Sequence, residues 1–184
     1  NIARLQTGMQ GLAVSELARQ KAMNYSRLRK QGRERSGVDK AIPIIDHADI
    51  KRNLAGINAF TEGARALALW TALLMDLDEE NFESVTNAEA KRLVGFLTPI
   101  IKAYFTDNAF IKASDALQCF GGYGYIKEYE IEQLVRDVRV AMIYEGTNSI
   151  QAMDLVFRKV LLDNGESIDV ITRLIKNLGV DSFS

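Results

Sequence analysis

Residues 88–124 read AEAKRLVGFLTPIIKAYFTDNAFIKASDALQCFGGYG, and this stretch decides the fold of the chain. Apolar side chains recur in it at helical spacing, which predicts one long helix from about Ala88 to Phe120. Pro99 should kink this helix, because proline lacks an N–H and its ring crowds the preceding turn. The glycine-rich run 121–124 should then end it, since glycine readily adopts the left-handed conformation of helix ends.

Two further segments show the same long periodicity, from about Ile2 to Lys30 and from about Ala48 to Leu77. Shorter helices are predicted at about 131–140 and 147–162, and no strand is predicted. Three helices of about thirty residues joined by loops, with shorter helices beside them, predict an all-α fold. We therefore expect an antiparallel four-helix bundle with extra short helices.

The pattern also gives a domain boundary near the end of the chain. Residues 1–162 are predicted to form the bundle, and 163–184 a C-terminal extension with a short helix. Asn164-Gly165 should end the last bundle helix. The apolar positions of that helix, which we expect to lie in the core, are Ile150, Met153, Phe157 and Val160.

Composition excludes several classes of function. With 23 Lys plus Arg and 24 Asp plus Glu, the net charge of -1 gives no basic surface for nucleic acid. No apolar run approaches the roughly 20 residues that a membrane span needs. One cysteine, Cys119, and one histidine, His47, are too few for an internal disulfide or a zinc site. We expect no metal, and we expect Asp46 or His47 to cap the following helix.

The glycine-rich run is the first candidate binding site. Gly121-Gly122 lets a ligand approach the main chain, and Gln118, one turn earlier, offers an amide that donates and accepts. A phosphate or a ribityl chain would suit this place. A plain glycine helix stop explains the same residues, and on this run alone that alternative is favoured.

The second candidate lies at Tyr144-Glu145-Gly146-Thr147, just before a helix start. Thr147 is a good cap, and Gly146 leaves its N–H open to a ligand. A carboxylate beside an open N–H can remove a proton while the N–H polarises a carbonyl. The alternative is that Glu145 only complements the helix dipole, and for this tetrapeptide alone it is favoured.

Taken together, the two candidates resemble the C-terminal signature of the acyl-CoA dehydrogenase family. In that signature Gln and a Gly-Gly-x-Gly run precede Arg-Asp-x-Arg and Ile-Tyr-Glu-Gly-Thr-Asn-x-Ile-Gln. Earlier stretches at 44–50, 61–68 and 97–103 resemble the larger bacterial dehydrogenases that act on methylmercaptopropionyl-CoA and similar thioesters. The matching residues of the signature are Gln118, Gly121, Gly122, Gly124, Tyr125, Glu128, Tyr129, Arg136, Asp137, Arg139, Ile143, Tyr144, Glu145, Gly146, Thr147, Asn148, Ile150 and Gln151.

The resemblance implies an oxidoreductase of fatty acid metabolism that oxidises the Cα–Cβ bond of an acyl-CoA with FAD as cofactor. It implies that Glu145 is the α-proton base and that the Gly146 N–H binds the thioester oxygen. Tyr144 would line the acyl pocket, and Thr147 would contact the flavin of its own subunit. We expect Glu145 to face the groove flanked by the double-glycine corner.

The resemblance also implies partners. Arg29 and the Gln118–Gly122 region would reach the FAD of a neighbouring subunit, so the protein should be a homo-oligomer. Electron-transfer flavoprotein or a similar protein would accept the electrons. The implied location is the bacterial cytoplasm, with the mitochondrial matrix as the alternative.

Two other functions compete with this interpretation. The bundle could be an oligomerisation or binding module that is inactive alone, or part of a non-dehydrogenase flavoprotein relative. The near-neutral charge argues against a DNA-associated relative. Because this chain lacks the family's flavin-covering domain and N-terminal helical domain, we expect it alone to bind FAD weakly or not at all and to show no turnover.

Overall fold

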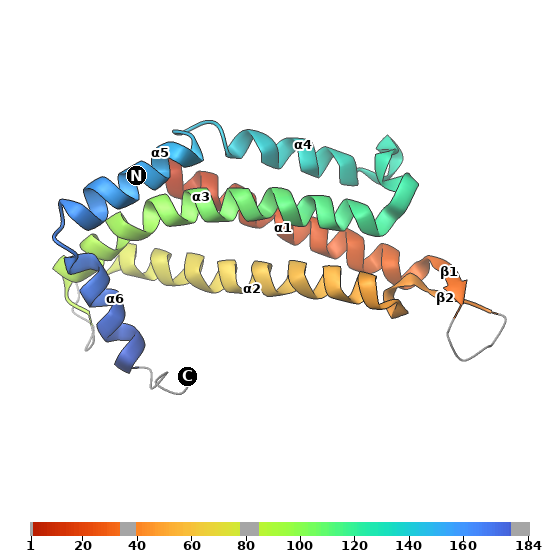
Figure 1. Cartoon of the computed structure of the whole chain (residues 1–184), viewed down its shortest axis with the longest axis horizontal. Coiled ribbons are helices and arrows are strands. Elements are labelled where there is room, and N and C mark those ends of the chain that lie inside the picture. The colour runs from red at the N-terminus through yellow and green to blue at the C-terminus, as the bar shows by residue number, and fades with distance from the viewer. Residues whose placement is uncertain (1, 34–39, 78–84, 178–184) are drawn as a thin grey trace.

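A computed structural model of the chain describes residues 2–33, 40–77 and 85–177. Within these residues, four helices run alternately in opposite directions and pack side by side (Figure 1). They are α1 (Ile2–Leu28), α2 (Ala48–Asp76), α3 (Asn87–Phe120) and α4 (Ile131–Ala141). The predicted all-α antiparallel bundle is confirmed.

Small residues bring α1 and α3 unusually close together. A Cβ added to Gly8 would lie 2.6 Å from Ile101 Cγ2, and one added to Gly11 would lie 3.1 Å from the Phe105 carbonyl oxygen. The α3 side of this contact is the centre of the core, where Ile101 and Phe105 are fully buried. The buried residues of α1 are therefore mostly small: Leu5, Thr7, Gly8, Gly11, Ser15, Ala18, Ala22 and Ser26.

The expectation that the chain has no strand is wrong. After α1 the chain forms a two-stranded antiparallel hairpin, β1 (Lys30–Arg33) and β2 (Ala41–Pro43). The short helix η1 (Ile44–Asp46) follows, and its Ile44 N–H donates to the Arg29 carbonyl oxygen at 2.8 Å. Strands this short and exposed carry no apolar alternation, so their pairing is not visible in the sequence.

The capping role of Asp46 or His47 is also wrong. His47 occupies the N-cap position of α2, but in the described structure its side chain makes no capping hydrogen bond. Its ring Nε2 lies 2.7 Å from the Gln31 carbonyl oxygen instead, which ties the start of α2 to the hairpin.

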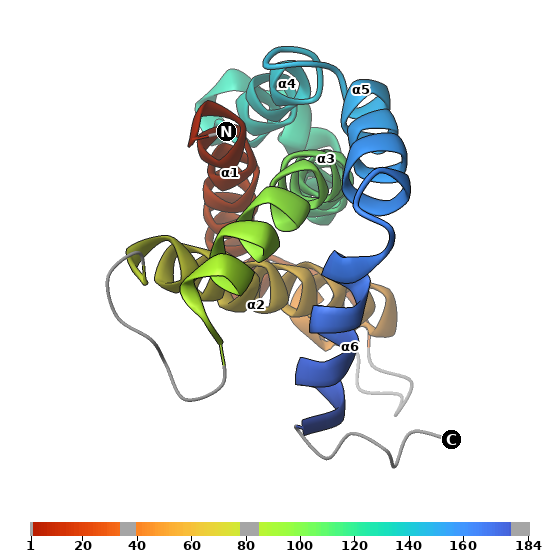
Figure 2. The ribbon, with the colours of Figure 1, turned by 90° about the vertical axis from the view of Figure 1, so that its left-hand side faces the viewer.

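The long helix α3 begins and ends close to its predicted limits. Thr86 and Glu89 form a reciprocal capping box at its start, and Gly121, with φ 58°, stands at its C-cap. The helix is continuous through Pro99, and Figures 1 and 2 show that its first turns run at an angle to the rest. Two short helices, η2 (Gly121–Tyr125) and η3 (Lys127–Tyr129), then lead into α4.

The last part of the chain wraps across one end of the bundle (Figure 2). Helix α5 (Asn148–Met153) continues as the π-helical segment η4 (Asp154–Leu161), and α6 (Glu166–Asn177) packs on the first turns of α3. Asn164 and Gly165 separate them with φ values of 52° and 79°, in agreement with the predicted helix end.

The apolar face predicted for this helix is mostly outside the core. Ile150, Met153 and Phe157 are 50%, 59% and 54% exposed, while Val160 packs against the core. The buried side of the helix carries Gln151 and Asp154 instead. Periodicity identifies an apolar face but does not say what covers it, and the bundle of this chain covers the other side.

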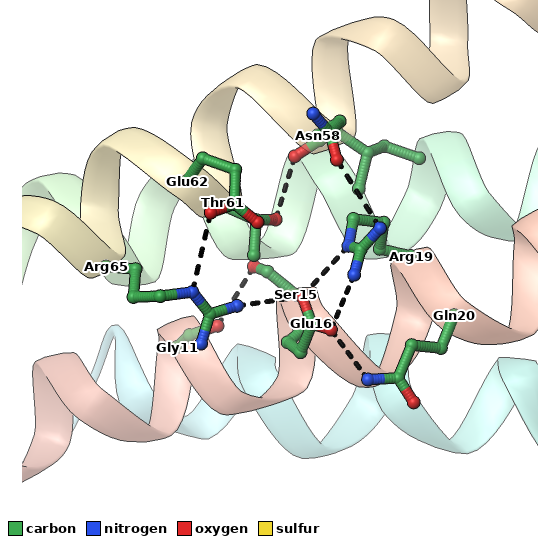
Figure 3. A network of polar contacts seen from close by, with 10 residues as sticks. Gly11, Ser15, Glu16, Arg19, Gln20, Asn58, Thr61, Glu62 and Arg65 are labelled. Carbon is green, nitrogen blue, oxygen red and sulfur yellow. Dashed lines mark hydrogen bonds and ion pairs between the residues drawn. The ribbon is translucent and has the colours of Figure 1, made fainter.

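A polar cluster centred on Glu16 joins α1 to α2 (Figure 3). The Glu16 carboxylate accepts hydrogen bonds from Arg19 at 2.7 and 2.9 Å, from Gln20 at 2.6 Å and from Arg65 of α2 at 3.1 Å. The hydrogen bonds from Arg19 are the main reason that the Glu16 pKa falls from 4.5 to about 2.

Replacement of Glu16 by Gln should therefore destabilise the bundle in a pH-dependent way. Because the pKa in the folded chain lies below the ordinary value, the ionised carboxylate stabilises the fold above about pH 4.5, and this contribution is lost as the pH falls toward about 2. We expect Glu16→Gln to lower the free energy of unfolding by about 1 kcal/mol at neutral pH. Urea unfolding at neutral and acidic pH measures the difference. The control is Glu62→Gln, which changes a more exposed carboxylate 3.7 Å from Arg65. If the loss of unfolding free energy in Glu16→Gln were the same at neutral and acidic pH, the ionised Glu16 carboxylate would not be its cause.

Candidate functional site

The backbone of the turn between α4 and α5 has a conformation that residues other than glycine rarely adopt. Glu145 has φ 56° and Gly146 has φ 84°, both in the left-handed region. For a residue other than glycine this costs free energy, and such strain gathers at functional sites. The Glu145 side chain is exposed on the surface of this chain.

A fully buried glutamine holds the backbone of this turn through hydrogen bonds. Gln151 Nε2 donates to the carbonyl oxygens of Glu145 and Gly146, at 3.2 Å each. A Cβ at residue 146 would lie 2.9 Å from this nitrogen, so both the space and the φ angle require glycine. Thr147 Oγ1 accepts from the Ile150 N–H at 3.4 Å, which confirms Thr147 as the cap of α5.

The turn leaves one backbone donor available next to the carboxylate. Among the described residues, no acceptor is found for the Gly146 N–H. Beside it, the Tyr144 hydroxyl donates to Gln10 Oε1 of α1, which places the tyrosine ring over that helix. The Glu145 carboxylate, the available Gly146 N–H and the Tyr144 ring thus lie at one turn. Gln10 was not among the predicted site residues, because its exposed position on α1 gives no sign of a role.

The second candidate site is a cleft of about 650 Å³ at the far end of α3. Arg29, at the end of α1, lies with its guanidinium carbon 5.4 Å from the centre of the Tyr123 ring. Its Nη2 donates to Gln31 Oε1 at 3.4 Å. The four residues predicted to bind a cofactor here all line the cleft: Arg29, Gln118, Gly121 and Gly122.

The glycine pair leaves this cleft open. Gly121 needs its φ of 58°, but Gly122 has no left-handed φ, and a Cβ on either would meet nothing within 4 Å. Packing within this chain therefore does not explain the glycine at 122. A guanidinium, an amide and exposed backbone form a donor set that suits a phosphate or pyrophosphate group. This observation favours a ligand over a plain helix stop.

The two candidate sites are separate, so the expectation that Glu145 faces the double-glycine groove is wrong. Glu145 does not line the cleft, and the two turns lie at opposite ends of α4 (Figure 1). An 11-residue helix extends about 16 Å. Tyr144, Gly146 and Thr147 stay with Glu145, while the four cleft residues form a second group. Each end of α4 therefore carries one of the two groups of candidate site residues.

The other potentially reactive side chains of the described residues do not form a further catalytic or metal site. Cys119 borders the cleft but is buried, and burial raises the pKa of its thiol to about 11, which disfavours the nucleophilic thiolate. In the part of the chain that the structure describes, no group of three or more His, Cys, Asp or Glu side chains could hold a metal ion. Across the same residues, no helix has the length and apolar character to cross a membrane.

Comparisons with known proteins find clear relatives of this chain. A family model described as "Acyl-CoA dehydrogenase, C-terminal domain" matches residues 1–160. The chain is 45% identical over 166 residues to 3-methylmercaptopropionyl-CoA dehydrogenase of Ruegeria pomeroyi, covering 90% of this chain and 28% of that protein. It is 34% identical over 187 residues to a broad-specificity linear acyl-CoA dehydrogenase of Mycobacterium tuberculosis, covering 98% and 30%.

A third relative and two solved structures extend the comparison. The subunit CarC of the caffeyl-CoA reductase-Etf complex of Acetobacterium woodii is 32% identical over 153 residues, covering 83% of this chain and 35% of that protein. ACDH-11 of Caenorhabditis elegans, solved with C11-CoA, has a TM-score of 0.72 at 25% identity, covering 85% and 24%. Butyryl-CoA dehydrogenase of Megasphaera elsdenii has a TM-score of 0.59 at 27% identity, covering 83% and 34%.

The first two relatives are much longer than this chain, which spans less than a third of each. The match covers both the strained turn at Glu145 and the glycine cleft, since both lie within residues 1–160. By sequence and fold, the chain belongs to the acyl-CoA dehydrogenase family, whose C-terminal helical domain it forms.

Proposed function

We propose that the protein containing this chain is an FAD-dependent acyl-CoA dehydrogenase in which Glu145 is the catalytic base. The reaction oxidises the Cα–Cβ bond of an acyl-CoA thioester to a trans-2-enoyl-CoA. The observation that carries the proposal is the left-handed Glu145-Gly146 turn, which holds a carboxylate next to an available N–H. The names of the most similar relatives support the same chemistry.

The turn supplies the two functions that removal of an α-proton requires. The Glu145 carboxylate takes the proton, and the Gly146 N–H donates a hydrogen bond to the thioester oxygen, where enolate charge develops. FAD, when bound, takes up the β-hydrogen with its electron pair, so that the C=C bond forms as both hydrogens leave. Tyr144, fixed by Gln10, would form one wall of the acyl pocket.

The residues at the glycine cleft fit the phosphate-bearing part of FAD. Arg29, Gln118, Gly121 and Gly122 would hold it there, while Thr147 would contact the flavin at the other end of α4. As the family resemblance implies, the two groups would serve two different FAD molecules in a homo-oligomer, and their positions at opposite ends of α4 are compatible with this. The exposed apolar residues Ile150, Met153 and Phe157 support this, because such a face is suited to contact with another domain or subunit.

The proposed electron acceptor is an electron-transfer flavoprotein. The relative from Acetobacterium woodii is named as a subunit of a complex with Etf, which supports this choice. The relatives from Ruegeria pomeroyi and Mycobacterium tuberculosis are bacterial, and we propose the bacterial cytoplasm as the location of the reaction.

A panel of acyl-CoA thioesters tests the proposed function. The full-length protein, loaded with FAD, is mixed anaerobically with each thioester, and the flavin absorbance is followed before turnover is measured with a dye acceptor. Bleaching of the flavin by at least one saturated acyl-CoA, with formation of the enoyl product, is the expected result. A panel of short, long and thioether-containing acyl groups that bleaches no flavin would refute the proposal.

Removal of Arg29 should weaken cofactor binding. A guanidinium that binds a pyrophosphate contributes charge-assisted hydrogen bonds, so Arg29→Ala should raise the dissociation constant of FAD at least about tenfold. Flavin absorbance per chain after gel filtration measures this. Arg27→Ala is the matched control, because Arg27 is exposed in the last turn of α1 and does not line the cleft. Equal flavin retention in the two variants would remove Arg29 from the site.

A further inference from the structure

A lysine lies fully buried in the middle of α3, behind the turn that carries Glu145. The side chain of Lys102 has no exposed surface, although burial of an ammonium group without partners is strongly unfavourable. Its Nζ donates to Asn148 Oδ1 at 2.7 Å. Desolvation by burial lowers the Lys102 pKa. Because the burial of the Lys102 ammonium group is unfavourable, its presence here calls for a functional explanation.

Asn148 connects this lysine to the Glu145 turn. It is the first residue of α5 and directly follows Thr147. Its Nδ2 donates to Asp107 Oδ1 at 2.6 Å and to Thr106 Oγ1 at 2.9 Å, both on α3. With its amide oxygen on Lys102 and its amide nitrogen on Asp107, Asn148 is held to α3 by two charge-assisted hydrogen bonds.

The charges around Lys102 come from three elements. Asp107 on α3 and Glu145 on the turn favour its protonated form, and Arg4 on α1 opposes it. Asp107 is the larger of the two favourable influences.

We infer that Lys102 is a positioning residue for the Glu145 turn, which it fixes on α3 through its hydrogen bond to Asn148. The inference rests on the proposed function, in which Glu145 is the base. It concerns a residue that makes no hydrogen bond to Glu145 itself in the described structure. Small displacements of a catalytic group reduce rates strongly, so such a residue can matter without touching the substrate.

Three variants of the full-length, FAD-loaded protein test whether Lys102 positions the Glu145 turn through Asn148. Lys102→Met removes the charge and the hydrogen bond but keeps a long side chain. Asn148→Ala breaks the connection and leaves the lysine in place. Lys112→Met is the matched control, because Lys112 lies on the same helix and pairs with Asp115 rather than with the turn. Hydrogen exchange of amides 142–148, kcat and KM are measured for each.

For Lys102→Met we expect faster exchange at 142–148 and a loss of kcat of about 10- to 100-fold, with KM changed less than about threefold. Asn148→Ala should also speed exchange at 142–148 and lower kcat. Lys112→Met should match the parent protein in every measurement.

Exchange at 142–148 in Lys102→Met that equals the parent value would overturn the positioning role. If Lys102→Met does not fold, Asn148→Ala decides, since unchanged exchange and kcat there would refute the connection. The exchange measurement needs no substrate. A protein that oxidises no acyl-CoA would therefore refute the proposed function, while the exchange at the turn would still decide whether Lys102 positions it.

Discussion

Glu145→Gln in the full-length protein should reduce acyl-CoA oxidation by about 10³- to 10⁴-fold and leave the flavin content unchanged. Glutamine has nearly the same size as glutamate and can occupy the same left-handed turn, which Gln151 holds through backbone oxygens alone. The amide, however, does not accept the α-proton. Single-turnover bleaching of the flavin under anaerobic conditions measures this step directly, because it separates proton removal from electron transfer to an acceptor.

The chain offers a matched control for this substitution. Glu130 is also an exposed glutamate with positive φ, 57°, and it stands at the other end of α4, paired with Lys21 at 2.7 Å. Glu130→Gln should bleach the flavin at the parent rate. If Glu145→Gln retains a rate within about tenfold of the parent, the base lies elsewhere and the role of the turn is reduced to binding.

Gly8→Val should be the most damaging substitution for the fold. A single added Cβ would already lie 2.6 Å from Ile101 Cγ2 and 3.0 Å from the Ile101 carbonyl oxygen, and valine adds two methyl groups beyond it. The side chain of Ile101 can shift, but the backbone of α3 at this fully buried residue cannot do so cheaply. We expect the free energy of unfolding to fall by about 3 kcal/mol or more, measured by guanidinium denaturation.

Gly63→Ala provides the opposite control. Gly63 lies within α2, and an added Cβ would meet nothing within 4 Å. Alanine is the better helix former, so this variant should be more stable by about 0.5–1 kcal/mol. If Gly8→Val were as stable as the parent chain, α1 and α3 would not pack as closely as the structure shows. If Gly63→Ala were destabilised, that surface of α2 would be covered in solution.

The sequence alone predicted the helices, their ends and the residues of both turns. The limits of α1, α2 and α3 fall within about two residues of the predicted ones. Thr147 caps α5, and Gly121 and Gly165 end helices as expected. These features depend on neighbours within a turn or two along the chain, so the local sequence contains the information.

Only the tertiary structure decided how far apart the two turns lie and which surfaces are covered. The sequence placed Glu145 at the glycine groove, but α4 separates them. The hairpin depends on pairing across residues with no apolar pattern. The burial of Lys102 depends on Asn148, which lies 46 residues further along the chain. A lysine in a helical pattern normally predicts an exposed position, and only a distant polar partner that replaces water can make it a buried one.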